Sequence, residues 1–259
     1  MAKVVAICNQ KGGVGKTTTS VNLACSLALL KKRILLVDLD PQGSATTSVG
    51  INRGNLKYTI YELFLKKCKF SQSVYPIKNF NNFDIIPATV DLGAAEINLI
   101  DQEEREYILE DILSKVQDRY DYIFLDCPPT LGLITLNALY AANSIIIPVQ
   151  CQFLAIDGLT QLFNTIRIIQ KHKRVNNKQL DIEGILLTML DKRTKSGWEV
   201  VNEVKTYFKD KVFKNFIVSN VAAQEAPAHG IPLVLYKPKS PSAKLYKSLA
   251  KEFLKKNEK

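Results

Sequence analysis

The glycine-rich segment at residues 8–19, which reads CNQKGGVGKTTT, constrains this sequence more than any other feature. The apolar run before it, residues 4–8, has the composition of a buried strand, and a helical pattern follows it over residues 17–30. Glycines between a strand and a helix let backbone N–H groups converge on an anion without Cβ clashes. The positive end of the helix dipole adds to that attraction. The segment therefore predicts a phosphate-binding loop.

The residues of this loop have expected roles in holding a nucleotide. Lys16 can reach the β- and γ-phosphates, and the hydroxyl of Thr17 can ligate Mg²⁺. The predicted cofactors are accordingly ATP and Mg²⁺. The loop residues expected to contact the nucleotide are Lys11, Gly12, Gly13, Val14, Gly15, Lys16, Thr17 and Thr18.

The loop departs from the common pattern G-x-x-x-x-G-K-[ST] at its first position. That pattern requires glycine five residues before Gly15, where this chain has Gln10, and a second lysine, Lys11, follows. A single loop lysine is most simply a solvated charge. The complete string K-G-G-V-G-K-T-T nevertheless favours a functional role for Lys11.

Aspartates follow two further strand-like runs, in residues 35–43 (LLVDLDPQG) and 122–129 (YIFLDCPP). Asp126 ends an apolar run, which is the usual setting of a carboxylate that contacts Mg²⁺ through water. Asp40 is the candidate for orienting the attacking water, whereas Asp38 is expected to support the metal site or the loop. The predicted metal site comprises Thr17, Asp40 and Asp126.

Taken together, these motifs resemble the ParA/MinD family of ATPases, in which K-G-G-V-G-K-T-T is the deviant Walker A motif. Residues 122–129 are similar to the family's Walker B and switch II segment, and residues 225–232 (EAPAHGIP) to a loop near its C-terminus. The resemblance covers nearly the whole chain and is strongest to the Soj-like, chromosomal type of ParA.

The resemblance implies that two subunits share the reaction. The first lysine of the family motif, here Lys11, crosses a dimer interface to the nucleotide of the partner. ATP would then favour a homodimer and ADP would release it, and a cation supplied in trans contributes about 10³–10⁵ in rate. The residues expected to act in hydrolysis are Lys11, Lys16 and Asp40.

The fold class follows from short apolar runs that do not alternate with polar residues. They recur at residues 4–8, 34–37, 123–125, 145–149 and 185–187 and are rich in Ile, Val and Leu. Strands of this kind are buried on both faces of a parallel sheet. With helical stretches between them, such as 17–30 and 105–117, we expect an α/β fold: a doubly wound, mostly parallel sheet with helices on both faces, of the P-loop NTPase type. The site should lie beyond the strand C-terminal ends.

We expect residues 1–259 to form a single domain, with an irregular connection over residues 50–82 and a basic C-terminal helix at about 241–256. Ser240 and Pro241 suit the N-cap and first position of that helix. Five cysteines lack metal-ligand spacing, and Cys127, beside Asp126, is interpreted as structural.

Positive charge gathers in three clusters, at residues 171–178, 192–195 and 237–259, of a chain whose formal net charge is +10. A basic stripe alone is often only a solvated face, but contact with the DNA backbone requires such charge. The family resemblance implies non-specific binding of double-stranded DNA and a ParB-like centromere-binding partner. The residues expected to contact DNA are Lys192, Arg193, Lys195, Lys237, Lys244, Lys247 and Lys251.

One departure from the family bears on DNA and adenine binding. Soj-like relatives carry two arginines just before the EAP loop, where residues 218–222 here read VSNVA. Either the lysines compensate for these arginines, or DNA affinity is low. Asn220 is the expected adenine contact in this altered segment.

Three alternatives remain open: a MinD-like membrane-cycling ATPase, an ATP-switch regulator of replication initiation, and a P-loop synthetase that forms amides. No apolar run approaches the ~18 residues that span a bilayer, and a strand-like run starts at residue 4 in place of a leader. We therefore expect a cytoplasmic, nucleoid-associated protein without a membrane partner.

Overall fold

The structure, a computed structural model, describes residues 1–152, 159–175 and 177–258. Its central feature is a seven-stranded sheet in the order β3-β4-β2-β5-β1-β6-β7, in which β3 is antiparallel to β4 and the other pairs are parallel. The strands are β1 (Lys3–Ile7), β2 (Ile34–Asp38), β3 (Tyr75–Pro76), β4 (Phe83–Ile86), β5 (Tyr122–Asp126), β6 (Ser144–Gln150) and β7 (Asp181–Thr188).

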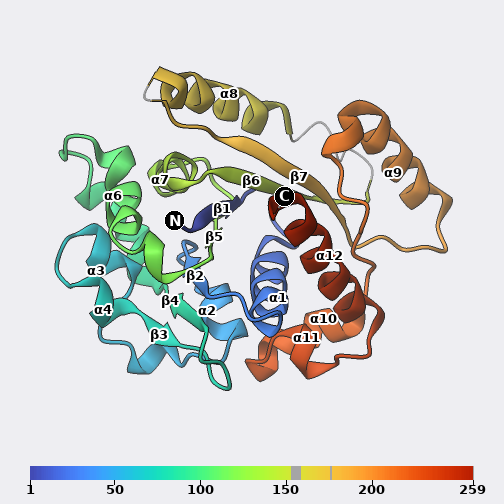
Figure 1. Cartoon of the computed structure of the whole chain (residues 1–259), viewed down its shortest axis with the longest axis horizontal. Coiled ribbons are helices and arrows are strands. Elements are labelled where there is room, and N and C mark those ends of the chain that lie inside the picture. Colours follow the sequence, from blue (N-terminus) through green and yellow to red (C-terminus); the bar gives the residue numbers. More distant parts are fainter. Residues whose placement is uncertain (153–158, 176, 259) are drawn as a thin grey trace.

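Helices cover both faces of this sheet, as Figure 1 shows. They are α1 (Lys16–Leu29), α2 (Ser44–Ser48), α3 (Ile60–Phe64), α4 (Phe70–Ser73), α5 (Ala95–Asn98), α6 (Ile108–Ser114), α7 (Leu133–Ala141), α8 (Thr160–Val175), α9 (Lys195–Phe208), α10 (Val221–Glu225), α11 (Leu233–Tyr236) and α12 (Pro241–Asn257). The predicted doubly wound α/β fold is confirmed.

The two faces of the sheet have separate apolar cores. Val4 and Ala6 of β1 pack with residues of α3, α6, α7 and α8, whereas Val5 and Ile7 pack with residues of α1, α11 and α12. Alternate side chains of a strand point to opposite faces. Both sets are therefore apolar, which is why the runs in the sequence are continuous.

The predicted element positions hold closely for the central strands and for α1. Residues 105–117 form a shorter helix than expected, because α6 is flanked by 3₁₀ turns at Arg105–Tyr107 and Gln117–Arg119. Residues 50–82, expected to be irregular, contain α3, α4 and the edge strand β3. Within the described residues, no helix is long and apolar enough to cross a bilayer.

The basic C-terminal helix begins as predicted: the side chain of Ser240 accepts a hydrogen bond from the Ala243 N–H, and Pro241 opens α12. Its apolar side lies on α1 and the sheet. The ring of Phe253 stands edge-on to Tyr122 at 5.2 Å and is tilted against Phe124 at 5.8 Å between centroids. This packing uses the apolar side of α12, so its exposed lysines face solvent.

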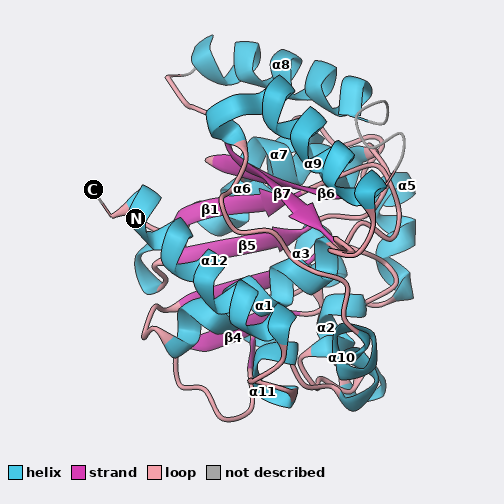
Figure 2. Ribbon diagram, turned by 90° about the vertical axis from the view of Figure 1, so that its right-hand side faces the viewer, coloured by secondary structure: helices cyan, strands magenta, loops and turns pink. Residues whose placement is uncertain are grey.

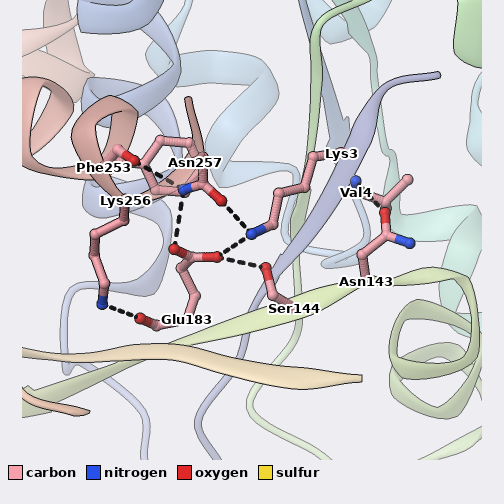
Figure 3. A network of polar contacts seen from close by, with 8 residues as sticks. All are labelled: Lys3, Val4, Asn143, Ser144, Glu183, Phe253, Lys256 and Asn257. Carbon is pink, nitrogen blue, oxygen red and sulfur yellow. Dashed lines mark hydrogen bonds and ion pairs between the residues drawn. The ribbon is translucent and has the colours of Figure 1, made fainter. Parts of the chain in front are cut away.

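A polar network fastens the end of α12 to the N-terminal edge of the sheet (Figure 3). The buried carboxylate of Glu183 in β7 accepts hydrogen bonds from Lys3 Nζ at 2.5 Å, Ser144 Oγ at 2.9 Å and Asn257 Nδ2 at 3.0 Å. Lys256 Nζ donates to the backbone carbonyl of Glu183 at 2.7 Å. Burial raises the pKa of Glu183, but the hydrogen bonds and charge of Lys3, with the other donors, outweigh it and leave the pKa below its ordinary value.

Replacing Glu183 by Ala should lower the free energy of unfolding by about 3 kcal/mol, because it removes one member of a largely buried ion pair. Urea denaturation at pH 7 would measure the loss. Since the folded-state pKa of Glu183 lies below its ordinary value of 4.5, this contribution is fully present above pH 4.5 and disappears as the pH falls through the folded-state pKa. Glu199→Ala, at an exposed position of α9, is the control. Equal stability of the two variants at pH 7 would contradict the role of the network.

Candidate nucleotide-binding site

A cleft of about 610 Å³ lies at the C-terminal edge of the sheet, where the predicted motifs converge. Figure 2 shows the strands pointing toward the side of the molecule that carries α2 and α10. The lining residues come from the glycine-rich loop, from residues 40–53, and from three later segments, which contribute Pro129, Met189, Pro227 and Ala228.

The glycine-rich loop takes the conformation that a phosphate cradle requires. Gly13 and Gly15 have φ of +74° and +87°, a region that other residues rarely adopt. Gly15 is the N-cap of α1, so the helix N-terminus faces the cleft. The end of β7 fixes the loop, because Thr188 Oγ1 donates a hydrogen bond to the carbonyl of Val14 at 2.8 Å. An anion at the loop would meet backbone N–H groups already in place.

The two loop lysines have opposite environments. Lys16 is buried, and its Nζ donates a hydrogen bond to the carbonyl of Lys11 at 3.2 Å, which holds the ammonium over the loop. Lys11 is exposed, and it is not among the residues that line the cleft of its own chain. Its backbone N–H is tied to Asn9 Oδ1 at 3.0 Å. The backbone of Lys11 is therefore fixed beside the cleft while its side chain reaches outward.

Two buried carboxylates, Asp38 and Asp126, lie side by side at the ends of the paired strands β2 and β5. Burial raises the pKa of both; repulsion from Asp38 adds to the rise at Asp126, and repulsion from Asp40 adds to the rise at Asp38. Ser20 Oγ donates to Asp126 Oδ1 at 2.7 Å, but the buried Oδ2 of Asp126 has no hydrogen-bond partner among the described residues. Thr17 and the ammonium of Lys16 also lower the pKa of Asp126. These oxygens suit Mg²⁺, because a hard dication would satisfy the free oxygen and offset the repulsion.

Asp38 also organises the loop that carries Asp40. Its Oδ2 accepts hydrogen bonds from the N–H and the Oγ1 of Thr46, at 2.8 and 2.7 Å, and its Oδ1 accepts from the Asp40 N–H at 3.2 Å. Asp40 itself lines the cleft and is partly exposed. These hydrogen bonds give Asp38 a supporting position in the loop, and the role of Asp40 toward the attacking water stays a prediction.

The cleft contains residues that the sequence did not single out. Arg53 lines it, and Arg53 Nη1 donates to the carbonyl of Gln42 at 2.6 Å. No motif indicated Arg53, because it lies in the stretch expected to be irregular. Pro227 and Ala228 line the cleft from the EAP loop, whose resemblance to the family was the available signal.

Asn220 is not among the residues that line the cleft. Its Oδ1 accepts a hydrogen bond from the Ala222 N–H at 2.8 Å and so caps α10. Its contact with adenine stays a prediction.

The residues predicted to contact DNA differ in their surroundings. Arg193 is paired with Asp191 and Lys237 with Glu225, each at 2.8 Å, whereas Lys244 and Lys251 are exposed on α12 and Lys247 is partly covered. Lys192 lies over the ring of Phe216, and Lys195 is exposed at the start of α9. Residues 217–219 join the basic segment after β7 to the basic helix α12. Their backbone forms hydrogen bonds with the backbone of Leu190, after β7, and accepts one from Ser242 Oγ of α12.

Replacing Thr46 by Val should lower the free energy of unfolding by about 1–3 kcal/mol. The change removes a hydroxyl that donates to Asp38 and accepts from the Ala88 N–H at 3.0 Å, so buried polar groups lose their partners. Thr47→Val is the matched control, because the exposed hydroxyl of Thr47 donates only to the carbonyl of Gly43 in its own helical turn. Urea denaturation of both variants would measure the difference, and equal losses would contradict the support role of Thr46.

Comparison with known proteins relates this site to a family. A family profile described as "AAA domain" matches residues 2–182. The sporulation initiation inhibitor protein Soj of Bacillus subtilis is 51% identical over 252 residues, which cover 97% of this chain and 98% of that protein. The chromosome-partitioning ATPase Soj of Treponema pallidum is 45% identical over 98% of both chains.

Among solved structures, a cobyrinic acid a,c-diamide synthase from Mycobacterium smegmatis with bound ADP and magnesium matches with a TM-score of 0.86. It is 33% identical, and the match covers 100% of this chain and 96% of that one. The glycine-rich loop, the paired aspartates and relatives that match along almost the full length agree with one another, and the chain belongs to the ParA/MinD family of P-loop ATPases, in its Soj-like ParA branch.

Proposed function

We propose that this chain is an ATPase of chromosome or plasmid partitioning that dimerises with ATP, holds DNA without sequence preference as that dimer, and is reset by a ParB-like partner. The observation that carries the proposal is the placement of Lys11. A complete phosphate cradle lies beside an exposed lysine that does not line its own cleft. Such a lysine is available to a second subunit.

ATP and Mg²⁺ are the cofactors of this site. Bound Mg²⁺ would neutralise phosphate charge. Thr17 and Asp126 would hold the ion, directly or through water. The loop N–H groups and Lys16 bind and orient the phosphates, and the carboxylate of Asp40, at the open side of the cleft, orients the attacking water and accepts its proton. No feature of the described residues favours the amide-forming alternative, although three matching structures of one protein are named a synthase.

The exposed face of α12 supports non-specific DNA binding. Lys244, Lys251 and Lys255 are exposed there, and this stripe can meet phosphates while the opposite side of the helix stays in the core. The same helix does not favour the membrane alternative, because Leu249 and Phe253 are buried in the protein. They are therefore not available to a lipid surface. The nucleoid association expected from the sequence rests on this DNA contact.

Replacing Lys11 by Ala should leave nucleotide affinity within about twofold while lowering ATP turnover by about 10³ or more, because only the cation supplied across the dimer is lost. Fluorescent-nucleotide titration and a phosphate-release assay would measure the two quantities. Lys67→Ala, at an exposed lysine far along the chain, is the control.

A mixing experiment separates action in trans from action within one chain. Lys11→Ala and Asp40→Ala should each be inactive alone, but a mixed dimer has one site with both groups, Asp40 from one subunit and Lys11 from the other. Mixing should therefore restore part of the turnover. Failure to regain activity, although both variants bind ATP and form mixed dimers, would contradict a lysine acting across the interface.

Replacing Lys244 and Lys251 together by Glu should weaken binding of the ATP-bound protein to random-sequence duplex DNA at least about tenfold, and it should reduce the slope of log K against log salt by about 2. The charge-matched control replaces Lys67 and Lys78, both exposed and outside the three basic clusters. Fluorescence anisotropy across a salt series would measure both effects. Equal weakening in the control pair would show a net-charge effect and no DNA-binding face on α12.

A further inference from the structure

An apolar groove of about 730 Å³ lies outside the nucleotide cleft, among α5, α7 and α8. Figure 1 shows α7 between α6 and α8, and α5 is labelled in Figure 2 at the edge toward which the strands point. The apolar side chains used in the argument are Ile97, Ile100, Leu133, Leu136 and Ile168.

The groove exposes large aliphatic side chains that the fold does not use. Ile97, Ile100 and Ile168 are 75%, 59% and 55% exposed. They are three of the four exposed isoleucines in the part of the chain that the structure describes. Single exposed apolar residues need no explanation, but several that share one hollow mark an interaction surface.

The rim of this groove includes an acidic segment, in a chain that is otherwise basic. Residues 96–106 contain five carboxylates and a single base, Arg105, whereas the whole chain has a net charge of +10. Glu96 and Glu106 line the groove directly, and Arg105 is engaged with the carbonyl of Ile100. An occupant with complementary charge therefore carries lysines or arginines beside its apolar side chains.

The groove is mechanically connected to the nucleotide cleft. The segment from Pro129, which lines the cleft, to Leu131, which lines the groove, spans three residues. Glu96 Oε1 accepts the N–H of Ile134 at 3.5 Å, and it lies so close to Gly132 that a Cβ built there would be 2.0 Å away. The carboxylate is thus seated on the turn that follows Asp126, and any shift of this turn with the nucleotide would move a wall of the groove.

We propose that this groove binds a basic amphipathic helix of a partner protein. Apolar side chains at positions i, i+3 or i+4, and i+7 of that helix would fill the hollow, and flanking lysines or arginines would meet the acidic rim. The partner's role as the factor that resets the ATPase rests on the proposed function, whereas the groove's chemistry does not. The contact beside the turn after Asp126 places the partner where it can change hydrolysis without entering the nucleotide cleft.

Two fluorescent synthetic peptides of equal length test the proposal on the full chain with ATP. Both carry the same leucines at helical spacing; one has lysines at the other positions and its twin has glutamates. Anisotropy should show that the lysine peptide binds at least about tenfold more tightly than its twin. Ile97→Lys should weaken the lysine peptide about tenfold. The matched control, Val90→Lys, changes a residue that is 71% exposed and outside the groove, and should stay within twofold.

Charge reversal at the rim gives an independent arm. Glu106→Lys should reduce the preference for the lysine peptide over its twin at least about fivefold, because one rim charge changes sign. Equal binding of the two peptides to the unaltered chain would overturn the proposal, as would equal effects of Ile97→Lys and Val90→Lys.

Two further outcomes would assign the groove to another occupant and also overturn it. Loss of the ATP dimer in Ile97→Lys would identify a contact between copies of this chain. Co-sedimentation with anionic phosphatidylglycerol vesicles that depends on Ile97 would identify a lipid surface. If the unaltered chain binds ATP, dimerises and binds DNA but neither peptide, the groove proposal fails while the proposed function stands.

Discussion

The repulsion between two buried carboxylates is the constraint on which the site depends. Asp38 and Asp126 end neighbouring parallel strands, burial raises the pKa of both, and repulsion from Asp38 raises that of Asp126 further. Asp38 directs both of its oxygens to the loop that follows β2, whereas Asp126 keeps one oxygen without a partner in the described structure. The same pair therefore shapes a loop and leaves a ligand for a dication. A sheet that joined these strands in another order would separate the two functions.

The phosphate loop is also connected to the basic helix through the core. α1 begins at the loop, and α12 lies along α1, with Tyr246 Oη 3.3 Å from Thr19 Oγ1. The N–H of Val234 in α11 donates to Asn22 Oδ1 of α1 at 3.1 Å. Opposite sides of α12 thus contact the helix that carries the nucleotide loop and present lysines to solvent. A change in the packing of α1 would therefore shift α12, and with it the lysines proposed to contact DNA, directly.

Sequence periodicity and motif spacing were sufficient for the fold class, the central strands and the phosphate loop, because these depend on local pattern. The short edge strand β3 and its neighbour β4 were not predicted; β3 is two residues long, and its pairing is set by β4. Arg53 was not predicted as a cleft residue for a related reason. Its position depends on a hydrogen bond to the carbonyl of Gln42, and its segment has no periodicity. The acidic residues at the rim of the groove can be recognised in the sequence. That they border an apolar hollow is a property of tertiary structure alone.

On the proposed function, the two loop lysines make a monomer of this chain an incomplete catalyst. Lys16 is held to the backbone carbonyl of Lys11, so its positive charge stays at the loop of its own chain. Lys11 has its backbone fixed by Asn9 while its side chain remains in solvent. Under that proposal, a second cation at the terminal phosphate would come from another subunit, and the free energy of ATP contacts would be divided between binding and dimerisation. A partner seated beside the turn after Asp126 would act on that division without replacing any group in the cleft.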